Sequence, residues 1–418
     1  MSRVIALCFL LLAAVLGFIH IDSRPTWASF ASNEIETQPE QIESAAVQPV
    51  IKGKASPQAL IAAPRADWLP DTGAASVHAA SLITLKDGSV RAFWFAGSRE
   101  GASDVAIYTA VLDLRSNTWS APTVAMDRVT AEKSLSRYIA KLGNPVPARL
   151  ADGRMQLFFV TVSIGGWAGS SISSVVSDDE GLTWSQPQRL ITSPLINLST
   201  LVKSPTVTFT DGLLGLPAYH EWIGRFGEFL RVDAGQVIDK RRMSSGRSAI
   251  QPIMFVTSPQ EAIAYFRQTR GAGQAKQIPV SHTQTAGQSW QALSDLEIAN
   301  PNSAVAGLAL KNGARLLALN NTEDGRHRLV LLMSDPKSGL WHTIETLEND
   351  EALPNEQRKE FSYPYLMSVD GNDAHVVYTW DRKKIRHVHF SSAWLARAYS
   401  QLSQQGSNEP GAEVKEAQ

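Results

Sequence analysis

Cysteine is almost absent from this chain, with a single residue, Cys8, among 418. Because Cys8 lies inside an apolar N-terminal stretch, the rest of the chain can form neither a disulfide nor a cysteine-ligated metal centre. The fold must therefore be held by its apolar core. Hydrophobic residues make up 44% of the chain, which is enough for one large domain.

An excess of either charge is missing as well. The 39 basic and 40 acidic residues leave a formal net charge of −1, so bulk electrostatics give no reason to expect nucleic acid as a partner. The sequence also has no glycine-rich phosphate loop, no His-Glu-x-x-His motif and no Cys/His spacing typical of zinc. We therefore expect no cofactor, and any charged ligand must be recognised by individual arginines.

Three histidines, His375, His387 and His389, fall on predicted strands near the C-terminus. His387 and His389 are two residues apart and share one face of a strand, which leaves a metal-binding pair open. Strand histidines are more often buried or surface side chains, so the sequence predicts no metal site.

The single long apolar run covers Val4 to Ile19 and follows a basic residue, Arg3. This order is typical of a secretory signal peptide, with cleavage expected after Ala28 or Ala31. The sequence therefore predicts an exported protein, periplasmic or secreted, which would be held at the inner membrane only if this segment stays uncut.

The predicted domain organisation has four parts. Residues 1–31 are a signal peptide or N-terminal anchor, and residues 32–63, rich in Gln, Glu, Ala and Pro, are a disordered linker. Residues 64–397 form the folded domain, and residues 398–418 form a polar tail. We expect a monomer, with membrane contact only through an uncleaved N-terminal segment.

The most informative motif is the octapeptide from Ser177 to Trp184, which reads Ser-x-Asp-x-Gly-x-Thr-Trp. Asp179 and Gly181 suit a tight hairpin turn, because an Asp side chain bonds the local backbone and glycine has no Cβ. Thr183 restarts a strand, and Trp184 can wedge between neighbouring sheets. Such a turn is called an Asp-box.

Degenerate copies of this motif recur along the chain. The intact motif contains Trp184, and the copies contain Trp119, Trp290 and Trp341. A further degenerate copy is expected near residues 232–235. A second series of repeats, formed by Asp-Gly or Asn-Gly turn dipeptides, has the same spacing. These dipeptides lie at residues 87–88, 152–153, 211–212, 312–313 and 370–371, and a degenerate copy is expected near residues 258–261.

Long amphipathic helical patterns are hard to find, whereas short Val/Ile/Leu/Phe/Tyr runs bounded by turn residues are frequent. The two series of turn motifs, each with about 50 to 65 residues per repeat, indicate six repeats. The sequence therefore predicts an all-β fold, a six-bladed β-propeller with degenerate Asp-box turns. A strand near residues 74–81 is expected to close the ring by completing the last blade.

From about residue 65 to residue 395 the chain resembles bacterial sialidase-like propellers of the BNR, or Asp-box, repeat type. Besides the turns, the resemblance depends on short stretches at residues 77–83, 95–107, 143–145, 202–205, 216–219, 300–303 and 360–366. It implies a ligand at the propeller axis, where inner strands begin, with Tyr219 among the residues that line it.

Sialidases hold a substrate carboxylate with three arginines and use a Tyr nucleophile, a Glu beside it and an Asp acid/base. The resemblance places Tyr363 at the nucleophile, Asp104 at the acid/base and Arg99 near the first inner strand. Arg270, with Arg267 as its rival, and Arg326, with Arg328 as its rival, match the carboxylate-binding arginines. Planar guanidinium groups suit a carboxylate because they bind it bidentately.

Two residues depart from the sialidase pattern. His78 stands where the first arginine is expected, and histidine is a weaker, pH-dependent partner for a carboxylate. Gln251 stands where the Glu beside the Tyr nucleophile is expected, and an amide cannot accept a proton. Glu221, Glu360 and His220 are the alternative bases.

Three functions stay open from the sequence. The first is an exported glycoside hydrolase of sialidase type that acts on an acidic sugar. The second is a polysaccharide lyase on uronate polymers, with His78 and Tyr363 as base and acid. The third is a non-catalytic propeller that binds an acidic glycan.

Overall fold

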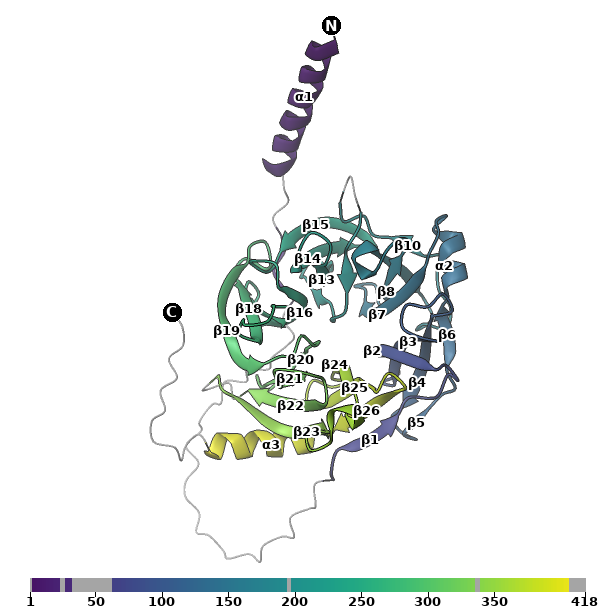
Figure 1. Cartoon of the computed structure of the whole chain (residues 1–418), viewed down its shortest axis with the longest axis vertical. Helices are drawn as coiled ribbons and strands as arrows, with labels where there is room; N and C mark the ends of the chain where they lie inside the picture. Colours follow the sequence, from purple (N-terminus) through teal and green to yellow (C-terminus); the bar gives the residue numbers. More distant parts are fainter. Residues whose placement is uncertain (1, 23–26, 32–61, 194–196, 335–338, 406–418) are drawn as a thin grey trace, which may run out of the picture.

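The computed structural model describes residues 2–22, 27–31, 62–193, 197–334 and 339–405. Its strands form six antiparallel sheets, arranged as blades around a central axis (Figure 1). The predicted all-β, six-bladed propeller is confirmed. The expected linker at residues 32–63 lies almost wholly outside the described residues.

Each blade runs from an inner strand near the axis to an outer strand. Blade one contains β2 (Ser76–Thr84), β3 (Val90–Gly97), β4 (Ala106–Asp113), β5 (Thr118–Trp119) and β6 (Thr123–Met126). Blade two contains β7 (Lys141–Arg149), β8 (Met155–Val162), β9 (Ser170–Ser177) and β10 (Gln188–Arg189). Blade three contains β11 (Leu201–Val202), β12 (Val207–Thr208), β13 (Leu214–His220), β14 (Phe226–Asp233) and β15 (Gln236–Arg242).

The remaining blades repeat the order. Blade four contains β16 (Ala249–Val256), β17 (Ala262–Gln268), β18 (Gln277–Thr283) and β19 (Gln291–Ala299). Blade five contains β20 (Ala306–Ala309), β21 (Arg315–Leu319), β22 (Arg328–Ser334) and β23 (Trp341–Asn349). Blade six contains β24 (Phe361–Met367), β25 (Ala374–Trp380), β26 (Lys384–Phe390) and β1 (Arg65–Trp68).

Strand β1 closes the ring, because it pairs antiparallel with β26, with Arg65 opposite His389 and Asp67 opposite His387. The expectation that residues 74–81 complete the last blade is wrong. That segment forms most of β2, which is almost fully buried and is the inner strand of blade one. A strand buried on both faces belongs near the axis, whereas the half-exposed β1 suits an outer edge.

The Asp-box between β9 and β10 folds as its residues predict. The backbone N–H of Gly181 donates to Ser177 Oγ at 2.7 Å, and that of Thr183 donates to Asp179 Oδ1 at 2.8 Å. Gly181 has a φ of 88°, which glycine adopts without strain. Trp184 packs edge-on against Phe93 of blade one, with ring centroids 5.8 Å apart.

The apolar core consists of layers between adjacent blades. Six clusters of buried side chains each join residues of neighbouring sheets. The Asp-box tryptophans extend these layers, since each contacts an aromatic ring of the preceding blade. The pairs are Trp119 with His387, Trp184 with Phe93, Trp290 with Phe229 and Trp341 with Phe255.

Four inner strands carry a bulge close to their beginning. The register shifts leave a pair of residues without a partner in β2, β7, β16 and β24. The first residue of each pair has positive φ: Ala79 at 53°, Asn144 at 45°, Gln251 at 51° and Tyr363 at 53°. A proline follows in three of the four cases. Because all four bulges lie at the same end of the ring, they bring side chains from different blades together there.

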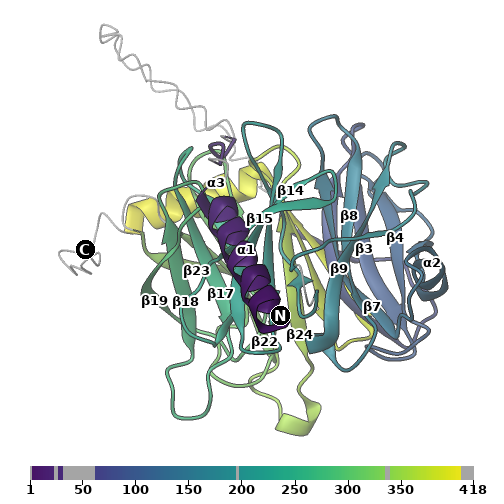
Figure 2. The same cartoon turned by 90° about the horizontal axis from the view of Figure 1, so that it is seen from above.

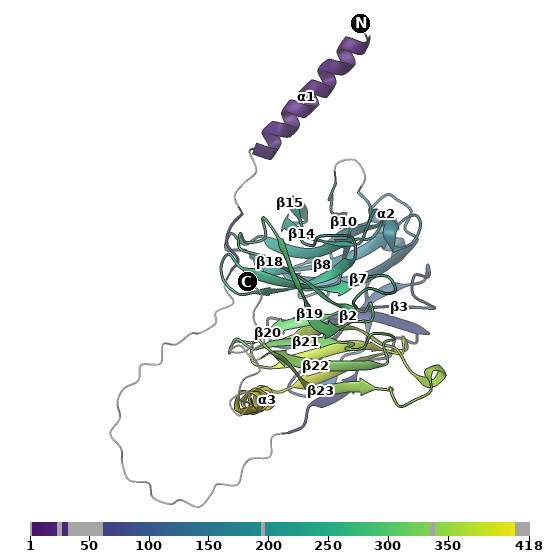
Figure 3. The same ribbon diagram turned by 60° about the vertical axis from the view of Figure 1, so that its left-hand side comes forward.

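The described residues include three α-helices, all outside the blades. Helix α1 (Ser2–Asp22) projects away from the ring, as Figure 1 and Figure 3 show. Helix α2 (Arg128–Ser134) packs against blade one through Ala131 (Figure 2). Among the described residues, no helix combines the length and apolar character that crossing a membrane requires.

Helix α3 (Ser392–Gln405) continues into the segment predicted to be a polar tail. Its residues Leu395 and Leu402 are buried in the layer between blades five and six, and Figure 3 shows the helix beside β23.

Residues 27–31 dock on the propeller between blades three and four. Phe30 is fully buried and stacks on Phe209, with ring centroids 5.3 Å apart. The backbone N–H of Phe30 donates to the Pro259 carbonyl at 2.8 Å, and that of Ala31 donates to the Thr208 carbonyl at 2.9 Å. The expected cleavage points at Ala28 and Ala31 therefore lie within a segment that contributes to the layer between blades three and four.

The docked segment predicts a loss of stability on truncating Phe30. The variant Phe30→Ala should lower the free energy of unfolding by about 3 kcal/mol, because it leaves a cavity among buried rings. Urea unfolding followed by tryptophan fluorescence measures this change. The control Trp222→Ala removes a side chain that is 54% exposed and should change the value by less than about 0.5 kcal/mol. If Phe30→Ala changes the free energy of unfolding as little as Trp222→Ala does, Phe30 is not packed in the core.

Candidate functional site

A hydrogen-bonded cluster joins four blades at the bulged end of the axis. The Gln251 amide nitrogen donates to the hydroxyls of Tyr219 and Tyr363, at 3.2 Å each. Asn144 also donates to Tyr219, at 3.3 Å. The structure thus places three of the residues proposed from the sequence, Tyr219, Gln251 and Tyr363, in direct contact.

The Gln251 side chain has a defined orientation, because its amide oxygen accepts from Arg267 Nη1 at 3.3 Å. Its NH₂ group therefore faces the Tyr363 hydroxyl, which acts as acceptor in that bond. Among the described residues, no carboxylate is hydrogen-bonded to Tyr363. In the sialidase pattern a Glu at the position of Gln251 accepts the proton of the Tyr. Here a proton released by Tyr363 would need another acceptor.

His78 packs against Tyr363, with ring centroids 4.3 Å apart. The side chain is buried, and neither ring nitrogen has a hydrogen-bond partner in the described part of the chain. Burial lowers the pKa of His78 to about 4, so the ring is neutral at physiological pH. A buried polar ring without partners is costly, and the ring is held here by its contacts with Phe95 and Tyr363.

Lys203 lies buried beside this cluster and was not proposed from the sequence. Its ammonium donates to the Val305 carbonyl at 3.0 Å and to the Pro364 carbonyl at 2.6 Å. Burial, with a smaller effect of Arg267, lowers its pKa to about 7. The available signal was a lysine within an inner-strand motif, Val202-Lys203-Ser204-Pro205, which parallels Asn144-Pro145.

A small pocket opens beside this cluster. Its lining consists of Ala79, Ala80, Asn144, Pro145, Lys203 and Tyr363. Its free volume is about 10 Å³, roughly the room that one water molecule needs. The pocket can therefore receive at most one small group of a ligand, and a whole sugar ring would lie outside it.

Arg267, and not Arg270, is the arginine of blade four that reaches the cluster. Its Nε donates to Asn302 Oδ1 at 2.8 Å, and together with the bond to Gln251 this gives it two amide partners. Arg270 follows the end of β17 and pairs instead with Asp295 on the outer strand β19. Arg267 lies within β17, so the alternation of side chains along the strand fixes the face on which it lies, whereas Arg270 lies beyond the end of the strand.

Arg326 belongs to an ion-pair network at the rim of the site. It donates to Glu360 at 3.0 Å and to the Asn302 carbonyl at 3.1 Å, while Arg382 joins Glu360 to Glu100. Although burial acts to raise it, hydrogen bonds from Arg382 and Ser362 hold the pKa of Glu360 at about 2. Glu360 is therefore a poor base for Tyr363.

Asp104 and Arg99 lie on the loop between β3 and β4. The Asp104 carboxylate accepts from the Ser98 backbone and from the Ser98 hydroxyl, at 2.9 Å each. These bonds lower the pKa of Asp104, which opposes a role as general acid near neutral pH. Arg99 is exposed, and neither residue contacts Tyr363 among the described atoms.

Glu221 and His220 differ in their fitness as bases. Burial raises the pKa of Glu221, an effect that Arg267 partly offsets, and Glu221 is close enough to raise the pKa of Tyr219. His220 stacks on Phe226 and accepts from the backbone of Ile223. Glu221 is therefore the better-placed carboxylate of the alternatives.

Comparison with known proteins supports the relationship that the motifs suggest. The BNR repeat-like domain family matches residues 88–376. Among solved structures, the chain is similar to a Hadza microbial sialidase, with a TM-score of 0.62 and 15% identity over 76% of this chain and 66% of that one. The chain thus spans just under two thirds of that sialidase.

Two further structures show the same fold. The NanB sialidase of Streptococcus pneumoniae has a TM-score of 0.59 and 13% identity, over 77% of this chain and 69% of that one. A protein of unknown function from Dyadobacter fermentans has a TM-score of 0.60 and 12% identity, over 78% of this chain and 97% of that one. The search of curated proteins finds no match. At these identities the structural likeness establishes the fold.

The low pKa of Lys203 predicts a pH-dependent stability. Because the folded pKa is about 7 and the unfolded value is about 10.4, the unfolded chain binds more protons between these values. Stability should therefore rise with pH in this window. We expect Lys203→Met to reduce the gain in free energy of unfolding between pH 7 and pH 9 by about 2 kcal/mol, measured by urea titration. An unchanged gain would show that Lys203 is not the titrating group.

Proposed function

This chain belongs to the BNR repeat-like domain family, and we propose that it binds the carboxylate of an acidic sugar at the axial site. The observation that carries the proposal is the pair of cations Lys203 and Arg267. Lys203 donates to two carbonyls and Arg267 to two amide oxygens. Among the described residues, no carboxylate lies within ion-pair distance of either.

Lys203 is buried and Arg267 half-buried, and cations that lack an ion-paired carboxylate in such surroundings favour an anionic ligand, because the ligand supplies the opposite charge. Arg267 is near enough to lower the pKa of Lys203, so one carboxylate can interact with both. Binding an anion would restore the charged form of Lys203 and offset the cost of burying it.

The surroundings support a sugar as the carrier of that carboxylate. The Tyr363 ring and the alanine side chains of the lining offer an apolar surface, while Asn144 offers a neutral polar group at the pocket wall. The similar solved structures include sialidases, which supports a sugar of the sialic acid class. The N-terminal apolar segment supports export, which would bring the protein to extracellular or periplasmic glycans.

Replacing Arg267 tests the proposal. The variant Arg267→Ala should bind N-acetylneuraminic acid about 10- to 100-fold more weakly, as expected for the loss of about 1.5 to 3 kcal/mol from a charge-assisted hydrogen bond. Isothermal titration calorimetry measures the affinity. The methyl ester of the sugar, which lacks the charge, should bind the wild type equally weakly.

The matched control is Arg270→Ala, which removes an arginine of the same blade that pairs with Asp295. Its affinity for the sugar should equal that of the wild type. If both variants bind as the wild type does, or if the ester binds as well as the acid, the carboxylate site is wrong.

Hydrolysis of the glycosidic bond is the second candidate function. It is favoured by the position of Tyr363, whose hydroxyl borders the cavity beside His78. A neutral Tyr can attack an anomeric carbon next to a carboxylate, provided that another group accepts its proton. Gln251 cannot do so, and Glu221, with its raised pKa, or the partner-free nitrogens of His78 remain as acceptors.

Turnover separates this candidate from simple binding. If Tyr363 is the nucleophile, Tyr363→Phe should abolish release of sugar from a fluorogenic sialoside while changing affinity less than about threefold, because only the hydroxyl is removed. A sugar adduct on Tyr363, detected by mass spectrometry of the wild type, would support the retaining reaction.

Two other outcomes would reject hydrolysis. A product that absorbs in the near ultraviolet, formed from a uronate polymer, would indicate a lyase in which His78 and Tyr363 exchange protons. Binding of acidic sugars without any product from the wild type would leave the propeller as a carbohydrate-binding protein.

A further inference from the structure

A second cluster of polar side chains lies in blade six at the end remote from the axial site. Asp373 precedes β25, His375 lies on β25, and His389 lies near the end of β26, directly opposite His375 in the sheet. Tyr363 stands near the beginning of β24, whereas Asp373 follows the end of that strand. The two clusters therefore occupy opposite ends of the same blade.

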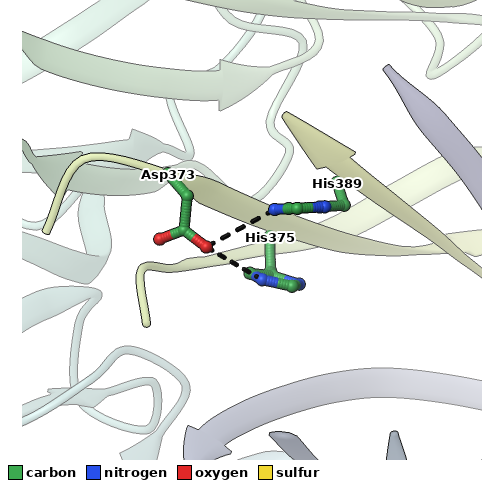
Figure 4. Close-up of side chains that lie close together, drawn as sticks. All are labelled: Asp373, His375 and His389. Atoms are coloured by element: carbon green, nitrogen blue, oxygen red, sulfur yellow. Dashed lines mark hydrogen bonds and ion pairs between the residues drawn. The ribbon is translucent and has the colours of Figure 1, made fainter. Parts of the chain in front are cut away.

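The three side chains converge on one oxygen atom, as Figure 4 shows. Asp373 Oδ2 lies 3.1 Å from His375 Nε2 and 3.4 Å from His389 Nε2. The three possible ligand atoms all lie within 4.8 Å of one another. Two ligand atoms bound to one tetrahedral zinc ion at about 2.0 to 2.1 Å are about 3.3 Å apart, which is close to both observed distances.

The carboxylate is held in place by its other oxygen. Asp373 Oδ1 accepts from the Ser368 hydroxyl at 2.6 Å and from the Val369 backbone at 2.8 Å. This leaves Oδ2 directed at the two histidines. Hydrogen bonds of this kind, made to the far side of a ligand, orient the ligands of metal sites and raise the affinity for the metal.

His375 is fixed by a chain of bonds to the closing strand. Its Nδ1 lies 3.0 Å from His387 Nε2, and His387 Nδ1 lies 3.0 Å from Asp67 Oδ1. Trp119 also donates to Asp67 Oδ1, at 3.2 Å. The sequence interpretation that paired His387 with His389 is thus altered, because His387 faces β1 and His375 is the neighbour of His389.

We propose that Asp373, His375 and His389 bind a divalent cation of the zinc class. Two imidazole nitrogens and one carboxylate oxygen are ligands that suit zinc, cobalt or nickel better than calcium or magnesium. Because the His389 side chain is 31% exposed, the ion can enter from solvent and keep water as a fourth ligand.

The ion would stabilise the closed form of the ring. It would join β25 to β26 directly and, through His387 and Asp67, β1 to the same sheet. Closure is the point at which the first and last parts of the propeller meet, so a bond there opposes opening of the whole ring. The site is therefore structural, and it differs from the axial carboxylate site in place, ligand type and charge.

Metal titration of the full chain tests the proposal. After treatment with EDTA and its removal, the wild type should bind one Zn²⁺ per chain with a dissociation constant of 10 µM or lower, measured by isothermal titration calorimetry and by elemental analysis. The melting temperature should rise with added Zn²⁺. Binding of the acidic sugar should not depend on the metal.

The variant His389→Gln removes the partly exposed ligand and leaves the buried chain intact. It should bind Zn²⁺ at least 30-fold more weakly and lose the rise in melting temperature. The control His342→Gln, on the strand β23, should behave as the wild type. The proposal is overturned if the wild type binds Zn²⁺ more weakly than 100 µM, or if His389→Gln binds it as tightly as the wild type.

Discussion

Burial of apolar surface between adjacent blades is the interaction on which the rest of the structure depends. A four-stranded sheet has two apolar faces and cannot cover either alone, so each blade is stable only against its neighbours. The six buried clusters each join adjacent sheets. The Asp-box tryptophans add to this packing, since Trp184 and Trp290 contact rings of the preceding blades. Every blade therefore needs both neighbours, and the ring must close.

Closure has a consequence for polar chemistry at the two ends of the molecule. At one end, the bulged inner strands bring side chains from several blades into a space too narrow for bulk water. Lys203 is desolvated there, which lowers its pKa, and Arg267 meets only amides. Positive φ recurs at Ala79, Asn144, Gln251 and Tyr363, so this backbone conformation is a feature of the repeat and does not depend on the side chain. The side chain at each bulge then determines which polar groups face the axial site.

At the other end of blade six, closure brings Asp67 of the first strand to His387 of the last. Their sequence separation is 320 residues, so this contact exists only in the closed ring. The polar chain that it completes runs through His375 to Asp373, with no axial residue involved. The two ends of the blade can thus carry independent functions, one for a ligand at the axis and one for the integrity of the ring.

What the sequence by itself determined is local. The Asp-box from Ser177 to Trp184 predicts its own hairpin, because the bonds of Asp179 and Gly181 lie within four residues. Repetition of such turns was enough to predict six blades. The resemblance also indicated that Gln251 belongs beside Tyr363, and their atoms are 3.2 Å apart.

What only the tertiary structure decided depends on contacts between distant segments. The choice of Arg267 over Arg270 follows from where β17 ends, and the burial of Lys203 follows from carbonyls of two other blades. The closing strand could not be identified from the sequence, because pairing with β26 leaves no local signal in β1, which has only four residues. Residues 27–31 resemble the end of an exported leader, yet Phe30 fills a gap between blades three and four. Each of these outcomes is set by the shape of the surrounding packing, which no pattern along the chain records.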